Sequence, residues 1–136
     1  MATDGHSELD RAVVQIVETR PEILAVWMFG SRARGEARAS SDLDLAILER
    51  VGSKLDGDAL GRLILALEQA TGLHVDLALL DGHAPVLAYE VLATGRRLFC
   101  REPESVDVLE ESWLSEYLDT EHLRRVQRAL RSEGSA

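Results

Sequence analysis

The chain has 136 residues and a mass of 15.0 kDa, which suits one domain with its own hydrophobic core. The core must be mainly aliphatic, because 46% of the residues are hydrophobic and only 4% are aromatic. A net charge of −9 disfavours a general nucleic-acid surface, and the single cysteine, Cys100, excludes a disulfide scaffold and a cysteine-based zinc site. No apolar run approaches about 18 residues and the N-terminus lacks a signal-peptide pattern, so we expect a soluble, cytoplasmic protein.

Helical and strand patterns alternate along the chain. Apolar spacing from Leu9 predicts an amphipathic helix over about 5–19, which closes before Pro21. The continuous apolar run Ile23–Phe29 has the length of a strand that is buried on both faces. A polar, arginine-rich loop follows, in which residues 31–34 could form a short helix.

Further elements follow in the same order. They are a strand over Leu43–Leu48, a helix over 57–71 stopped by Gly72, a strand over Leu73–Leu80, a helix over about 84–94, a short strand over Arg97–Cys100, and one long or two short helices over 106–130. This alternation predicts an α/β (α+β) fold in which helices flank a mixed or parallel sheet of about four strands.

Charge is segregated after Cys100. Eight acidic residues and no lysine or arginine lie between Glu102 and Glu121, and four arginines follow by residue 131. The helix dipole favours this order on a solvated helix, with docking of a partner as the alternative. We expect residues 1–100 to form one domain and residues 101–136 a helical extension that packs on it or on a partner.

Carboxylates stand inside apolar strands at two places. Asp42 and Asp44 project to one side of the second predicted strand, because residues two apart share a face. Like charges this close repel unless a cation separates them, and Mg²⁺ prefers carboxylate oxygens together with substrate phosphates. Asp76 in the third strand joins them if the two strands are neighbours. A solvated strand end is the alternative, but charged residues rarely stand in apolar strands unless they are paired or bind metal.

The turn after the first strand suits an anion. Gly30 allows another group to approach the backbone closely, and Ser31 could begin a helix whose free N–H groups face a phosphate. Arg32, Arg34 and Arg38 add positive charge. An ordinary strand-to-helix turn is the alternative. Beside a carboxylate pair, however, the turn forms half of a nucleoside-triphosphate site with two metal ions.

The loop and the strand that follows it carry a resemblance. The sequence Gly-Ser-Arg-Ala-Arg-Gly over 30–35 and Ser-Asp-Leu-Asp-Leu over 41–45 resembles the signature of the DNA polymerase β-like nucleotidyltransferase superfamily, with Asp76 at its third carboxylate. The loop is similar to that of the minimal nucleotidyltransferase (MNT) branch, whose short members act as antitoxins beside HEPN-domain ribonuclease toxins. The likeness covers about residues 10–100.

The resemblance implies a site and a reaction. It assigns catalysis and the two Mg²⁺ ions to Asp42, Asp44 and Asp76, and the ATP triphosphate to Gly30 and Ser31, with Arg32 assisting. Asp76 would also help to take the proton from the attacking hydroxyl. AMP would pass from ATP to a tyrosine of the partner HEPN toxin, with release of pyrophosphate, as in a type VII-like toxin–antitoxin pair.

Two other functions are open at this point. One is a nucleotidyltransferase with a small-molecule acceptor, as in aminoglycoside-modifying enzymes, although the segment after Cys100 is short for a drug-holding domain. The other is a binding-only antitoxin with a vestigial site, against which the three intact carboxylates argue. A nucleic-acid polymerase is least expected, because the chain is acidic and has no basic track.

Three further side chains have more than one interpretation. His74 lies two residues before Asp76 and could line the site, but we favour a strand-end histidine beside it, because Mg²⁺ prefers oxygen ligands. Trp113 and Tyr117, four positions apart, form either the core face of the last helix or an aromatic anchor for a partner, and we favour the core.

Overall fold

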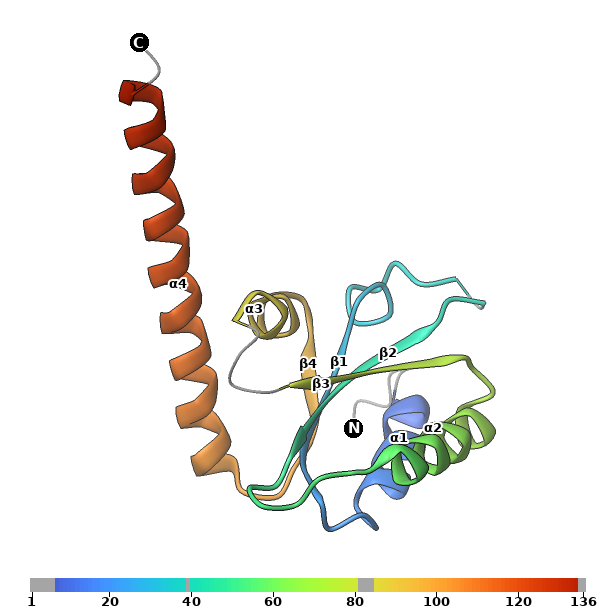
Figure 1. Ribbon diagram of the computed structural model, residues 1–136. Helices are drawn as coiled ribbons and strands as arrows, with labels where there is room; N and C mark the ends of the chain where they lie inside the picture. Colours follow the sequence, from blue (N-terminus) through green and yellow to red (C-terminus); the bar gives the residue numbers. More distant parts are fainter. Residues whose placement is uncertain (1–6, 39, 81–84, 135–136) are drawn as a thin grey trace.

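The computed structural model describes residues 7–38, 40–80 and 85–134. Its elements are α1 (Ser7–Val17), β1 (Ile23–Phe29), β2 (Leu43–Glu49), α2 (Gly57–Thr71), β3 (Val75–Leu80), α3 (Pro85–Thr94), β4 (Arg96–Cys100) and α4 (Pro103–Gly134). The strands form one mixed sheet in the order β3-β2-β1-β4. β1 is antiparallel to β2 and β4, whereas β2 and β3 are parallel, and helices cover both faces (Figure 1).

Most predicted elements are present, with shifts of a few residues at their ends. Helix α2 has the predicted bounds, because Asp56 caps its start through a hydrogen bond from the Ala59 N–H and Gly72 ends it in the left-handed conformation. The predicted short helix over 31–34 is wrong. Residues 31–35 form irregular turns, since the N–H groups of Arg34 and Glu36 donate to carbonyls four and five residues back.

The sheet is buried on both faces, which explains its continuous apolar runs. Leu43, Leu45 and Ile47 of β2 face the core shared with α1 and α2. On the other face, Ala46 and Leu48 belong to a core that includes residues of α3 and α4. Asp44 alternates with the first set and therefore lies on the α3 side of the sheet, at the point where the second core ends.

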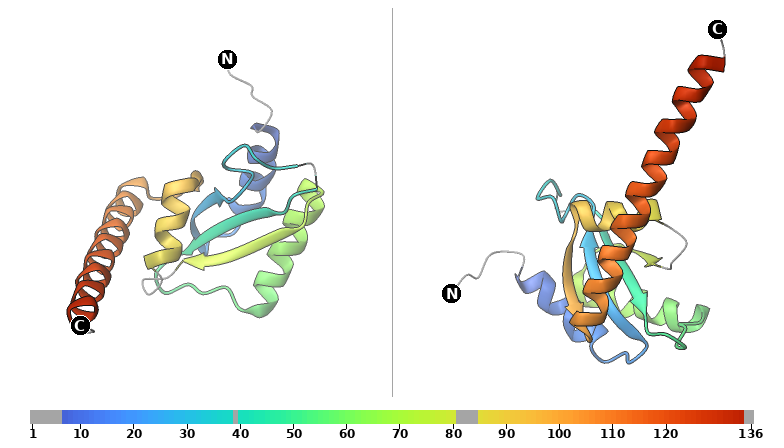
Figure 2. Two further views of the ribbon diagram at one scale, coloured as in Figure 1. Left: turned by 90° about the horizontal axis from the view of Figure 1, so that it is seen from above. Right: turned by 90° about the vertical axis from the view of Figure 1, so that its left-hand side faces the viewer.

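The C-terminal segment is a single helix that begins against the sheet and then leaves it. Trp113 is 4% exposed and its ring meets Trp27 edge to face at 5.9 Å, so the core interpretation of Trp113 is confirmed. The Trp27 indole N–H donates to Glu110, and Tyr117 stacks on Tyr89 of α3 at 3.8 Å. Beyond these contacts, residues 122–131 are all exposed and the helix projects from the body (Figure 2).

Helix α4 is long but polar. Within the ranges that the structure describes, no helix has the combination of length and apolar character needed to cross a bilayer.

We expect Trp113→Ala to lower the free energy of unfolding by about 3–5 kcal/mol, because it removes a buried indole and leaves a cavity. Urea unfolding measures this change. Leu118→Ala is the matched control on the same helix, since Leu118 is 54% exposed and should change stability by less than about 0.5 kcal/mol. Equal effects of the two substitutions would contradict the packing described for α4.

Candidate nucleotide and metal site

The start of two parallel strands brings the predicted carboxylates together. In the register of β2 and β3, Asp44 lies directly opposite Asp76, and Asp42 comes just before β2. The Leu43 N–H donates to the His74 carbonyl at 2.8 Å, which holds the two strand ends in this register. The three side chains predicted from the sequence therefore lie together where β2 and β3 begin. Their catalytic role stays a prediction.

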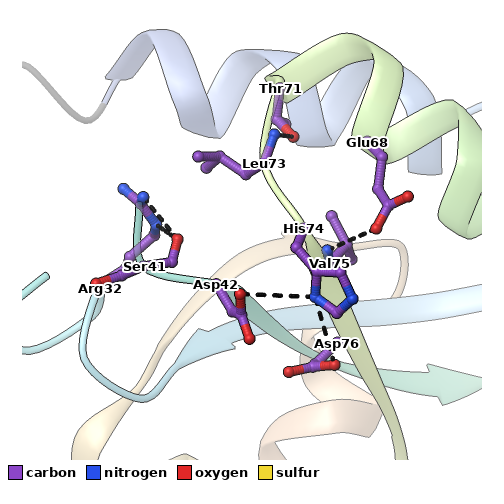
Figure 3. A network of polar contacts seen from close by, with 9 residues as sticks. All are labelled: Arg32, Ser41, Asp42, Glu68, Thr71, Leu73, His74, Val75 and Asp76. Carbon is purple, nitrogen blue, oxygen red and sulfur yellow. Dashed lines mark hydrogen bonds and ion pairs between the residues drawn. The ribbon is translucent and has the colours of Figure 1, made fainter. Parts of the chain in front are cut away.

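Asp42 and Asp76 share a histidine. The Nδ1 atom of His74 lies 3.6 Å from Asp42 Oδ1 and 3.8 Å from Asp76 Oδ1, and Figure 3 shows the imidazole between the two carboxylates. One ligand atom from each residue lies within 4.8 Å of the other two. The sequence predicts a strand-end histidine beside the site, whereas the structure places His74 between two of the carboxylates.

Asp44 carries the strongest electrostatic conflict in the site. Burial raises the pKa of its carboxyl above the usual 3.8, and the negative charges of Asp76 and Asp42 raise it further. Glu90 of α3 acts in the same direction, and Arg34 of the loop opposes it. A bound cation would relieve this repulsion, which is the electrostatic setting expected of a metal-binding carboxylate.

The turn after β1 touches Asp44 directly. Phe29, the last residue of β1, pairs with Asp44 across the sheet, and Gly30 follows with a φ of 76°. A Cβ atom at position 30 would fall on the Asp44 carboxylate, far inside van der Waals contact. Glycine is therefore required twice here, by the left-handed backbone and by the close approach of the carboxylate.

The arginines of the loop have different surroundings. The Arg32 guanidinium donates to the carbonyls of Ser41, at 2.8 Å, and Arg38, at 3.2 Å, so it ties the two ends of the loop together. It also lines a cavity of about 360 Å³ beside Leu9 of α1. Arg34 pairs with Glu36 at 3.1 Å and is the loop arginine whose charge acts on Asp44, which the sequence alone did not single out.

The donor set suits a divalent cation. Asp42, Asp44 and Asp76 lie at the neighbouring ends of two adjacent strands, and the charges of Asp42 and Asp76 act on Asp44. Carboxylate oxygens are the ligands that Mg²⁺ prefers in proteins. Asp42 and Asp76 are exposed, so an ion and the phosphates of a nucleotide could reach them from solvent. The arrangement can hold cations beside the Gly30 turn, and a triphosphate binds with such cations.

Comparison with known proteins places the chain in a family. Residues 11–104 match the family described as polymerase beta, nucleotidyltransferase. The chain therefore belongs to the polymerase β nucleotidyltransferase family, as its signature indicated.

The chain is also similar to an individual protein with a named activity. The chain is 32% identical over 79 residues to the protein adenylyltransferase MntA of Shewanella oneidensis. The aligned segment covers 58% of this chain and 55% of that relative, so the chain spans about half of the relative's length.

Solved structures share the fold along most of the chain. A chain in the crystal structure of a toxin–antitoxin with AMP-PNP is 24% identical, with a TM-score of 0.70 over 93% of this chain and 98% of its own. A chain in the complex of tri-AMPylated Shewanella oneidensis HEPN toxin with MNT antitoxin is 22% identical, with a TM-score of 0.67 over 96% and 99%. The predicted fold class is thereby confirmed.

Gly30→Ala should destabilise the protein by more than Gly35→Ala. Both glycines have a positive φ, so both substitutions carry a backbone cost of about 1–2 kcal/mol, but the space at Gly35 is open and the space at Gly30 holds the Asp44 carboxylate. Urea unfolding of the two variants isolates the close approach. Equal losses would show that Asp44 does not pack against this turn.

Asp44→Asn should raise the free energy of unfolding of the metal-free protein at pH 7. The raised pKa means that the folded state holds the Asp44 proton more tightly than the unfolded state. Stability of the parent protein therefore falls as the pH rises from about 3.8 through the folded pKa, and asparagine removes that loss. The advantage should vanish at low pH, where the parent carboxyl is protonated.

Urea unfolding between pH 4 and pH 8 measures this difference, with Asp58→Asn on the exposed face of α2 as the control. A variant that is no more stable than the parent at pH 7 would contradict the repulsion described for Asp44.

Proposed function

We propose that this chain is a nucleotidyltransferase that moves AMP from ATP to a tyrosine hydroxyl of a HEPN toxin, and so acts as an antitoxin. The observation that carries the proposal is the convergence of three carboxylates beside the Gly30 turn in a member of the polymerase β family. The match to an adenylyltransferase, MntA, supports a protein acceptor. The solved complexes with AMP-PNP and with an AMPylated HEPN toxin support ATP and that class of partner.

The chemistry assigns a task to each part of the site. The tyrosine oxygen forms a bond to the α-phosphorus of ATP, the bond from that phosphorus to the bridging oxygen breaks, and pyrophosphate leaves. Asp76 accepts the hydroxyl proton, since its side chain is exposed and a tyrosine of the partner can reach it from solvent. Gly30 and Ser31 would face the triphosphate, and Arg34 adds positive charge close to the carboxylates.

Cations complete the proposed site. Asp42, Asp44 and Asp76 would hold two Mg²⁺ ions, which supply positive charge to the triphosphate and to the leaving pyrophosphate. Without bound cations, the repulsion between Asp44 and the neighbouring carboxylates remains. Arg32, whose guanidinium ties Ser41 to the loop, would assist in binding the triphosphate and would also keep the turn in place.

The C-terminal helix belongs to the proposal as a separate part. Residues 1–100 would be the nucleotidyltransferase domain and residues 101–136 its helical extension, since the family match ends at residue 104, where α4 has just begun. Six of the nine large hydrophobic residues that the structure exposes lie on α4, which suits a segment that contacts the toxin. Because ATP is the substrate, we place the protein in the cytoplasm.

Incubation of the protein with ATP, Mg²⁺ and a candidate HEPN toxin, taken from a neighbouring reading frame, should add one or more AMP units to the toxin, measured by intact mass. Asp42→Ala and Asp44→Ala should abolish the mass increase, whereas Asp58→Ala, on α2 away from the site, should retain it. Asp76→Asn should keep some ATP binding but lose about 10²–10⁴-fold in rate, because it removes the proton acceptor.

Other outcomes point to the alternatives. Neutralisation of the toxin by Asp44→Ala as well as by the parent would indicate a binding-only antitoxin. Retained turnover in Asp76→Asn would remove Asp76 from the mechanism. A toxin that never gains mass, while a small-molecule hydroxyl does, would contradict the protein acceptor.

A further inference from the structure

One part of the site is not made of carboxylates alone. Asp42 Oδ1, His74 Nδ1 and Asp76 Oδ1 form a compact set in which the imidazole nitrogen lies 3.6 and 3.8 Å from the two oxygens. Two ligand atoms bound to one ion at about 2.0–2.2 Å stand roughly 3–3.7 Å apart for the usual bond angles. The imidazole nitrogen is thus close to the spacing that it would have from each oxygen around a common ion, and the ligand atoms of Asp42 and Asp76 lie within 4.8 Å of each other.

The backbone fixes this set before any ion arrives. His74 accepts a hydrogen bond from the Leu43 N–H, and the next N–H, that of Val75, donates to the Glu68 carboxylate of α2 at 3.0 Å (Figure 3). The donors stand at the ends of two paired strands rather than on a free loop. Such positions hold ligands more precisely than loops do.

Packing in the core does not explain the position of His74. Its side chain is 65% exposed, so it does not fill the core, and its described polar contacts are those with Asp42 and Asp76. Asp44 is different, because it packs against Gly30 and is not a member of the compact set. One cation position therefore has a nitrogen donor available, and the position nearer Asp44 has only oxygens.

We propose that His74 is a third protein ligand, which makes the position between Asp42 and Asp76 bind first-row transition-metal cations more tightly than Mg²⁺. Imidazole contributes strongly to the binding of Co²⁺, Ni²⁺ and Zn²⁺ and little to that of Mg²⁺, which keeps oxygen ligands and water. Mg²⁺ can still be held by the carboxylates alone. The inference rests on the cation site of the proposed function, but it does not depend on which group is transferred.

Metal titration of the protein without nucleotide tests the inference. We expect His74→Asn to weaken Co²⁺ binding by roughly tenfold or more and to leave Mg²⁺ binding unchanged within about twofold, because the substitution removes the imidazole nitrogen and keeps both carboxylates. Calorimetry measures both affinities. His122→Asn, at an exposed histidine of α4, is the matched control and should change neither.

A spectroscopic arm detects the bond itself. In Co²⁺-loaded protein, the ring protons of His74 should show large paramagnetic shifts in the proton NMR spectrum, and those of His122 should not. The shifts should disappear in Asp76→Asn as well as in His74→Asn. Unshifted His74 protons, an unchanged Co²⁺ affinity in His74→Asn, or an equal loss for Mg²⁺ and Co²⁺ would each overturn the proposal.

The two proposals can fail separately, because this experiment uses no ATP and no toxin. Selective loss of Co²⁺ binding in His74→Asn, together with a toxin that never gains AMP, would leave the metal inference standing and remove the proposed transfer. AMP transfer by the parent with no effect of His74 on Co²⁺ binding would do the reverse.

Discussion

The whole site depends on the in-register pairing of two parallel strands. Asp44 of β2 lies opposite Asp76 of β3, so two negative side chains meet where these strands begin. Both faces of the same sheet pack against apolar cores. β1 runs antiparallel to β2, so its end delivers Gly30 to the same place. A one-residue slip of either strand would turn its carboxylate to the other face and separate the turn from its partner.

This arrangement lowers the stability of the folded state through electrostatic repulsion. Burial and two neighbouring carboxylates raise the pKa of Asp44, and Glu90 adds to the repulsion. A protein selected only for stability would avoid such a cluster, since close like charges weaken the folded state. The conflict makes sense if cations occupy the site during function, and strained or repulsive groups are typical of functional sites. Here the same feature that lowers stability supports the proposed chemistry.

Much of the fold was predictable, because the signals were local. The apolar run of β1 and the caps of α2 at Asp56 and Gly72 define their elements without help from distant residues. The parallel pairing of β2 with β3 was left open, and it depends on how helices pack rather than on either strand. The irregular turn over 31–35 was missed because a side-chain contact within the loop, from Arg32 to the Ser41 carbonyl, helps to hold it, and local propensity does not reveal such a contact.

The residues that the structure brings together in the candidate site were named from the sequence, but their geometry was not predictable. Spacing of two residues put Asp42 and Asp44 on one face, but only the tertiary structure puts His74 between Asp42 and Asp76, and Gly30 against Asp44.

The most direct test of a metal site at these strand ends is the broadening of backbone NMR signals by sub-stoichiometric Mn²⁺. A cation bound at the ends of β2 and β3 should broaden residues 30–31, 42–44 and 74–76 first. Broadening that begins instead on the acidic part of α4, with these residues unaffected, would contradict this site.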